Sequence, residues 1–514
     1  MNRIPETAGG DAADRKRKFA GDRLPCIVAL DIGTSSVRAI MFDRRGRPVP
    51  DAEAQRAYQQ RTTADGGIES DPDAMVSLTV AVLRDLLKSR PAVELQSLKA
   101  VACSCFWHSL LAVDGNGHPV TPLYSWADTR ASRFALDLRK SVDAASYHAR
   151  TGCELHPCFW PAKLRWLKDD KAIAEKAARW LGFGEYLYLR LFGTAACSVS
   201  MASGTGLYNP NSLDWDDESL TLAGVDRSAL PNVTDLDKPM SGLTEAYRKA
   251  LPALANIPWF PPVGDGACSN IGSGGTGDTV IAMNIGTSAA MRVTVETDRL
   301  DIVPGLFCYR VDRRRFLVGG AFATGGNMYA WLEATLRVEN PTQMSRKIRA
   351  MAPDSHGLTV LPFWSGERSP GWHLGAQAAV LGMNLHTTPV DIMRASMESA
   401  GYLYDEVRKR LVERFPQAKT LVATGGALTH DPVWAQILAD VFSAPITTSD
   451  VFEASSRGAA ILALESLGVL KSAAAAPVRR GRVFKPVAEY HDRYRDAARR
   501  FNACYDAQVA HKNS

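Results

Sequence analysis

Two segments about half a chain apart share one pattern of hydrophobic and polar residues. In each, an apolar run (residues 27–30 and 280–283) leads through one polar residue to Ile-Gly-Thr-Ser and then to a second, largely apolar run. This pattern predicts a β-hairpin with a tight polar turn, and Gly33 and Gly286 allow the backbone to bend where a Cβ would clash. One such turn is typical of an ordinary hairpin, but two copies indicate a duplicated unit.

Both turns carry groups that donate hydrogen bonds to phosphate oxygens, namely backbone amides and the hydroxyls of Thr34, Ser35, Thr287 and Ser288. Asp31 ends the first predicted strand, where its carboxylate could hold the Mg²⁺ that accompanies a nucleotide. Asn284 takes the equivalent place in the second copy. Two such turns facing each other would grip a polyphosphate from both sides.

Other segments alternate between helical and strand-like periodicity, which favours an α/β fold. A buried strand is expected over residues 98–105, and residues 200–208 are expected to form a loop near the site. Helices are expected over residues 73–89, 389–415, 432–442 and 455–467. The aromatic residues of the segment 487–511 recur at helical spacing, so we expect an amphipathic docking helix there.

The length of 514 residues is too great for one core and fits two domains of roughly 250 residues. We expect a disordered leader (1–24), an N-terminal domain (25–275), a C-terminal domain (276–475) and a C-terminal docking helix (476–514). The glycine-rich run that ends at Gly277 is the natural hinge between the halves.

The net charge of +5 is spread over short basic clusters, which are typical of a solvated surface rather than of a nucleic-acid-binding stripe. No apolar run reaches the ~20 residues that span a membrane. The polar leader lacks the apolar core of a secretory signal, and the count of nine cysteines is odd. We therefore expect reduced thiols in a cytoplasmic protein, with Cys103, Cys105, Cys153 and Cys158 as packing residues.

Residues that could bind a polyol cluster between positions 106 and 130. His108 is followed by the motif Trp126-x-Asp128-x-Arg130, in which an aromatic face could pack on C–H bonds while charged groups bind hydroxyls. The same residues are also consistent with a buried Trp126 beside a surface pair of Asp128 and Arg130. Asp265 lies between two glycines, where it could act as a general base, although such an Asp is also common in plain turns.

Taken together, the motifs 31–35, 126–130, 264–266, 284–288 and 424–427 occur in the order found in the FGGY carbohydrate kinases, which this chain resembles from about residue 25 to 487. The signature residues at 378–383 and 391–398 are also met, whereas Cys158 and Trp160 depart from the usual residues before Lys163. The resemblance favours Asp31, Asp128 and Asp265 as functional residues.

The resemblance implies two RNase H-like domains of the actin/Hsp70/sugar-kinase fold, with ATP and Mg²⁺ in the cleft between them. It implies that Asp31 binds Mg²⁺ through water and that Asp265 is the base. It places His108, Trp126, Asp128, Arg130 and Gly266 with Asp265 at the sugar. It implies nucleotide contacts for Thr34, Ser35, Gly286, Thr287 and Gly326 at the phosphates and for Gly426 and His430 near the adenine.

Within the family, the segments 108–112, 151–157 and 365–372 are most similar to the gluconate kinase branch, and Gly266 stands where glycerol kinases carry Gln. Lys163, Arg130 or His156 could offset a substrate carboxylate. Phosphorylation of a pentulose, as in xylulose kinases, is the alternative. A chaperone-like ATPase or nucleotide switch on the same fold is a third reading, disfavoured by the polyol motif at Trp126. Dimers are frequent in this family, so a homodimer is compatible with the resemblance.

Overall fold

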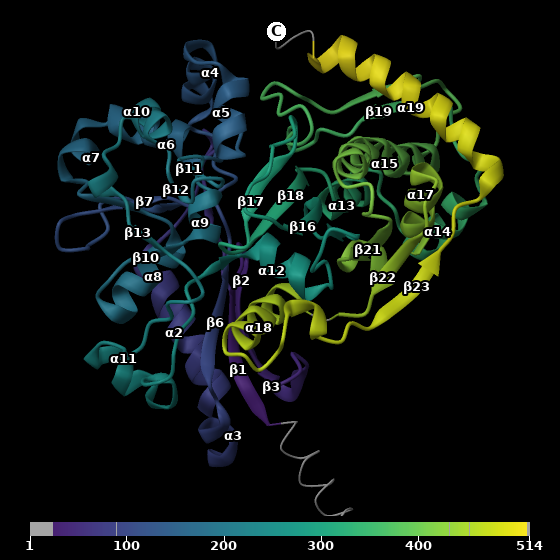
Figure 1. Cartoon of the computed structure of the whole chain (residues 1–514). Helices are drawn as coiled ribbons and strands as arrows, with labels where there is room; N and C mark the ends of the chain where they lie inside the picture. Colours follow the sequence, from purple (N-terminus) through teal and green to yellow (C-terminus); the bar gives the residue numbers. More distant parts are fainter. Residues whose placement is uncertain (1–23, 89, 431, 452, 511–514) are drawn as a thin grey trace, which may run out of the picture.

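The computed structural model describes residues 24–88, 90–430, 432–451 and 453–510, which form two mixed β-sheets with helices packed around each (Figure 1). The predicted leader lies outside the described residues except for residue 24. Among the described residues, no helix is long and apolar enough to cross a membrane.

The N-terminal sheet has the strand order β14-β6-β1-β2-β3. β1 pairs antiparallel with β2 and parallel with β6, so the predicted hairpin forms one side of the sheet and a crossover strand continues the other. The strands are β1 (Pro25–Ile32), β2 (Ser36–Asp43), β3 (Pro48–Ala57), β6 (Ala100–Cys105) and β14 (Val263–Gly264).

The C-terminal sheet has the order β17-β18-β16-β15-β21-β22-β23. β15 pairs antiparallel with β16 and parallel with β21, which repeats the pairing of β1. The strands are β15 (Val280–Ile285), β16 (Ala289–Glu296), β17 (Phe307–Arg310), β18 (Arg315–Phe322), β21 (Thr420–Thr424), β22 (Ile446–Ser449) and β23 (Arg480–Phe484). The predicted duplicated unit is therefore confirmed at the level of strand pairing.

Shorter strands pair outside the two main sheets. They are β4 (Arg61–Thr62), β5 (Ile68–Ser70) and β8 (Leu123–Tyr124); β7 (Leu111–Val113) with β9 (Arg179–Leu181); β10 (Ala196–Ser198) with β13 (Asn232–Thr234); β11 (Tyr208–Asn209) with β12 (Asp214–Trp215); and β19 (Thr359–Leu361) with β20 (Ala379–Leu381).

The helices of the N-terminal half are α2 (Pro72–Lys88), α3 (Ala92–Ser97), α4 (Ser132–Ser141), α5 (Ala144–Thr151), α6 (Trp160–Asp169), α7 (Lys171–Lys176), α8 (Phe183–Phe192), α9 (Val199–Ser203), α10 (Asp217–Ala223), α11 (Glu245–Ala250) and α12 (Asp265–Gly272). Those that follow are α13 (Gly326–Thr335), α14 (Pro341–Ala350), α15 (Pro389–Arg414), α16 (Gly426–His430), α17 (Pro432–Phe442), α18 (Ala454–Ser466) and α19 (His491–Tyr505). The predicted helices over 73–89, 389–415, 432–442 and 455–467 are confirmed within one or two residues at their ends, and residue 89 lies outside the described residues.

The expected loop over residues 200–208 was wrong in its first part. Residues 199–203 form α9, whose N-cap Ser198 accepts a hydrogen bond from the backbone N–H of Met201. This side chain satisfies an amide that helix formation leaves without a partner, which is why a short polar segment can be helical.

Each half has its own hydrophobic core, but residues from the C-terminal half contribute to the core of the N-terminal half. α18 lies between β22 and β23 of the C-terminal sheet in the chain, yet it packs on α12, β1 and β6 of the N-terminal half (Figure 1). Phe307, Tyr309 and Trp372 likewise belong to the hydrophobic core of the N-terminal half.

All nine cysteines are free thiols and eight of them are buried, as expected for packing residues.

The C-terminal helix α19 docks on the C-terminal half, with Tyr494 and Phe501 buried, as the aromatic spacing predicts. The carboxylate of Glu398 on α15 accepts hydrogen bonds from Arg394 and from the hydroxyl of Tyr494, and it lies 3.0 Å from Nε2 of His356. This buried network fastens α19 to α15.

Candidate functional site

A cavity of about 240 Å³ lies between the two halves of the protein, at the ends of β1, β6 and β14 and beside β16 and β17. The N-terminal half lines it with Thr34, Phe106, Trp107, His108, Trp126, Asp265, Gly266 and Ser269. The C-terminal half lines it with Asn284, Ser288, Ala289, Ala290, Arg292, Phe307, Tyr309, Ala321, Arg368 and Ser455. Residues from widely separated stretches of the chain, between Thr34 and Ser455, therefore meet at one small site.

Asp265 is the first residue of α12 and contributes the cavity's one carboxylate among these lining residues. Its Oδ1 accepts a hydrogen bond of 2.8 Å from the N–H of Gly266, which fixes the carboxylate at the start of the helix. Burial raises the pKa of Asp265, and the nearby Arg292 guanidinium opposes that rise. A carboxylate with a raised pKa is a stronger proton acceptor.

Trp107 and His108 form a second wall of the cavity. The indole Nε1 of Trp107 donates a 2.9 Å hydrogen bond to the carbonyl of Ser200 on α9, and a Cβ on Gly264 would lie only 1.8 Å from the ring. Nδ1 of His108 lies 2.5 Å from the carbonyl oxygen of Gly204. Because a carbonyl only accepts, Nδ1 carries the proton, and burial holds the pKa of His108 well below its usual range. Nε2 is therefore an acceptor suited to a hydroxyl.

The motif around Trp126 is divided between the cavity and the protein interior. Trp126 lines the cavity, whereas Asp128 and Arg130 do not. Nη2 of Arg130 donates to Asp128 at 2.6 Å and to Glu69 at 2.8 Å, and Asp128 also accepts from the N–H of Ile68. In this structure the two charged residues pair with each other and position the segment that carries Trp126.

None of the three cations that the sequence suggested for a substrate carboxylate lines the cavity. Arg130 is ion-paired, and Nζ of Lys163 donates to the carbonyls of His108 at 2.9 Å and Ser125 at 2.7 Å. His156 is buried, with Nδ1 accepting from the N–H of Cys158 and the ring against Trp372.

Two arginines that the sequence did not single out line the cavity instead. Arg292 lies on β16, four residues after the Ser288 turn, and Arg368 lies on the loop that follows β19. The Nε atoms of both are buried, and among the described residues neither has a hydrogen-bond partner. Arg368 lies within the segment 365–372, which is similar to the gluconate kinase branch. Its residue type alone did not indicate that its side chain points into the cavity.

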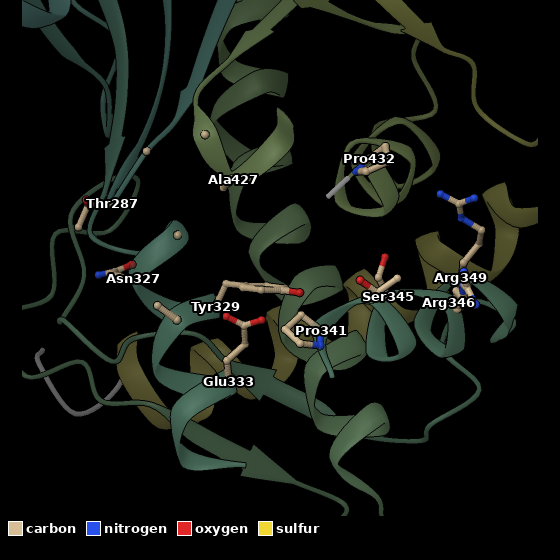
Figure 2. A pocket seen from close by; sticks show the side chains of 15 residues that line it. Thr287, Asn327, Tyr329, Glu333, Pro341, Ser345, Arg346, Arg349, Ala427 and Pro432 are labelled. Atoms are coloured by element: carbon tan, nitrogen blue, oxygen red, sulfur yellow. The ribbon is translucent and has the colours of Figure 1, made fainter. Parts of the chain in front are cut away.

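A second cavity, of about 860 Å³, lies within the C-terminal half (Figure 2). The predicted nucleotide residues Gly286, Thr287, Gly326 and Gly426 all line it. Figure 2 shows Thr287 and Asn327 at one end and Ser345, Arg346 and Arg349 of α14 at the other, with Tyr329 and Glu333 between them. The length of this cavity suits an elongated ligand.

The turn between β15 and β16 separates the two cavities. Gly286 and Thr287 line the larger cavity, whereas Asn284 and Ser288 line the smaller one. The start of α13 is tied to this turn, because the N–H groups of Gly326 and Asn327 donate to the carbonyls of Gly286 at 2.8 Å and Thr287 at 3.0 Å. A helix N-terminus and a glycine turn thus meet where an anion would be favoured.

Asp31 is the next-to-last residue of β1 and lines neither cavity, and Ser35 is an exposed residue of the first turn. Burial raises the pKa of Asp31 to about 6, and the nearby Asp265 acts in the same direction. Two neighbouring carboxylates that are costly to ionise together fit the chemistry of a divalent cation site.

His430 ends α16, but its side chain lies outside the described residues.

Comparison with known proteins gives the same two-part organisation. The model of the N-terminal domain of the FGGY family of carbohydrate kinases matches residues 26–272, and that of the C-terminal domain matches residues 281–467. A gluconokinase of Bacillus subtilis (strain 168) is 27% identical over 465 residues, which cover 87% of this chain and 88% of that protein.

Two solved structures have the same fold as this chain. The gluconate kinase from Lactobacillus acidophilus has a TM-score of 0.86 and 26% identity, covering 94% of this chain and 97% of that one. The ligand-bound xylulose kinase from Lactobacillus acidophilus also has a TM-score of 0.86 and 26% identity, covering 94% and 98%.

Proposed function

The chain belongs to the FGGY family of carbohydrate kinases, ATP-dependent phosphotransferases with an alcohol acceptor, and we propose that its acceptor is a sugar acid, with gluconate converted to 6-phosphogluconate. The observation that carries this proposal is the place of Asp265. Asp265 supplies the carboxylate of the smaller cavity. The turn over residues 284–288 lines both this cavity and the larger one, so the two cavities are neighbours.

In the proposed reaction, Asp265 accepts the proton of the acceptor's primary hydroxyl as that oxygen attacks the γ-phosphorus of ATP. The bond between the γ-phosphorus and the β,γ-bridging oxygen breaks, and ADP leaves with the electron pair. Trp126 packs on the C–H face of the acceptor, and Nε2 of His108 accepts from a hydroxyl. A general base contributes about 10²–10⁴ in rate.

The nucleotide is proposed to occupy the larger cavity. Thr287 of the turn would bind phosphates, with Gly286 and the start of α13 at Gly326 close beside them, together with Thr34 and Ser35 from the opposite turn. Gly426 would lie near the adenine, where a residue without a side chain permits close approach. Asp31 would hold Mg²⁺, which neutralises phosphate charge during transfer.

A pentulose acceptor is the second candidate. The xylulose kinase structure from Lactobacillus acidophilus is as similar to this chain, by TM-score and identity, as the gluconate kinase structure is. The first named relative in sequence is a gluconokinase, and this favours the acid.

A panel of acceptors in an ADP-release assay tests the proposal. We expect turnover of ATP to depend on an added acceptor and to be fastest with gluconate, and mass spectrometry should find one added phosphoryl group on it. Preference for xylulose would support the second candidate. ATP hydrolysis that no sugar or sugar acid stimulates would contradict both and favour a chaperone-like ATPase.

A further inference from the structure

The smaller cavity carries more positive than negative charge. The charged residues that line it are Asp265, Arg292 and Arg368, and His108 is neutral. Arg292 and Asp265 face each other, since each stabilises the charged form of the other. Asp265 also interacts with Arg368, but one carboxylate cannot balance two guanidinium groups, so the lining of the cavity keeps a net positive charge.

We propose that Arg368 binds the carboxylate of the acceptor and thereby selects sugar acids over neutral polyols. This inference rests on the proposed function, because it concerns the acceptor of the same reaction. It assigns to one residue the recognition that distinguishes gluconate from a pentulose.

Arg368 is held in place before any acceptor arrives. Its Cζ lies 5.4 Å from the ring centroid of Trp126 and 5.4 Å from that of Trp372, so the guanidinium makes cation–π contacts with a cavity residue and a core residue. These contacts restrict the planar group and leave its N–H edge for a ligand.

The loop that carries Arg368 is fastened on both sides. The carboxylate of Glu367 accepts from the N–H groups of Gly371 and His373 at 3.1 Å each and from the Tyr505 hydroxyl at 2.7 Å. From the N-terminal half, Nη2 of Arg139 donates to the carbonyl of Trp372 at 2.8 Å. These bonds reduce the conformational cost of binding an anion.

The chemistry of an arginine matches a carboxylate better than a hydroxyl. A guanidinium has five N–H donors and can bind the two carboxylate oxygens in parallel. The Nε of Arg368 is buried without a partner among the described residues, and a neutral acceptor would leave the net positive charge of the cavity uncompensated. A carboxylate would supply both the acceptor atoms and the charge.

The test compares two acceptors of equal chain length in the full-length protein: gluconate and the neutral polyol glucitol. For Arg368→Met we expect kcat/KM for gluconate to fall by about 10- to 100-fold, mainly through KM, and the loss for glucitol to be much smaller. Gluconate binding without nucleotide, followed by the fluorescence of the cavity tryptophans, should weaken by a similar factor. Arg368→Lys keeps the charge and should lose less.

Two controls isolate the effect. Arg292→Met should impair both acceptors alike, because Arg292 faces the base, and Arg133→Met, at an exposed position of α4, should change neither. Equal losses for gluconate and glucitol in Arg368→Met, or unchanged gluconate kinetics and binding, would overturn the inference. If the wild type phosphorylates gluconate and the Arg368 variants keep wild-type kinetics and binding, the inference alone fails. If the wild type phosphorylates no sugar acid, the proposed function fails with it.

Discussion

The guanidinium of Arg292 occupies space that any side chain on Gly266 would need. A Cβ on Gly266 would lie 2.8 Å from Nη2 of Arg292 and 2.7 Å from Cζ3 of Trp107. Packing therefore requires a glycine at position 266, because Arg292 from the other half of the chain and the indole of Trp107 both lie against it.

Gly266→Ala should therefore displace Arg292 or Trp107 from the cavity. We expect kcat/KM to fall by about tenfold or more, since contacts under 3.0 Å force one neighbour to shift and small displacements at a reacting centre are costly. Steady-state kinetics with gluconate measure the effect. Gly115→Ala, where an added Cβ would meet nothing within 4 Å, is the matched control and should behave as wild type.

Asp265→Asn removes the proton acceptor but keeps the shape of the side chain. We expect kcat to fall by about 10²-fold or more while nucleotide affinity stays close to that of the wild type. Single-turnover kinetics and an ADP-binding titration separate the two quantities. An unchanged kcat would remove Asp265 from the base role. Asp137→Asn, at an exposed position of α4, controls for loss of a carboxylate.

Arg292 should set the acidic limb of the pH profile. Burial raises the pKa of Asp265 and Arg292 lowers it, and the base works only when deprotonated, so activity falls as the pH drops through that pKa. Arg292→Met should shift the acidic limb of kcat/KM toward higher pH. A profile that keeps its acidic limb in place would show that Asp265 does not control it.

Lys163 should stabilise the cavity wall through its two backbone contacts. Its ammonium is fully buried and donates to the carbonyls of His108 and Ser125, the residue before Trp126. Lys163→Met leaves two buried carbonyls without this donor, at a cost of about 1–3 kcal/mol each. We expect a lower urea midpoint and a higher KM for the acceptor. Lys171→Met, at an exposed position of neighbouring α7, should change neither.

Glu185 should make stability depend on pH. Burial raises its pKa from 4.5 to about 7, and its Oε1 has no hydrogen-bond partner among the described residues. The folded state favours the protonated form, so this stabilisation is complete below pH 4.5 and is lost as the pH rises through about 7. Glu185→Gln should therefore be more stable than wild type at pH 8.5, by up to about 3 kcal/mol, with a smaller difference at pH 5.5. Urea unfolding at both pH values measures this, and an equal difference at the two would contradict it.

The sequence by itself determined the local elements and the order of the motifs. The two Ile-Gly-Thr-Ser hairpins could be recognised because alternating burial and a glycine turn are properties of neighbouring residues, and the strand pairing of β1 and β15 agrees with them. Asp265, Trp126 and His108 were found for the same reason, since each lies within a short motif.

Only the tertiary structure decided which charges face the cavity. Asp128 and Arg130 have the residue types of a polyol site, but Glu69, about 60 residues earlier, completes an internal ion pair with them. Arg292 and Arg368 reach the cavity from the other half of the chain, beside Gly266 and Trp126. The direction of a long charged side chain depends on partners that are distant in sequence, and local pattern carries no information about those partners.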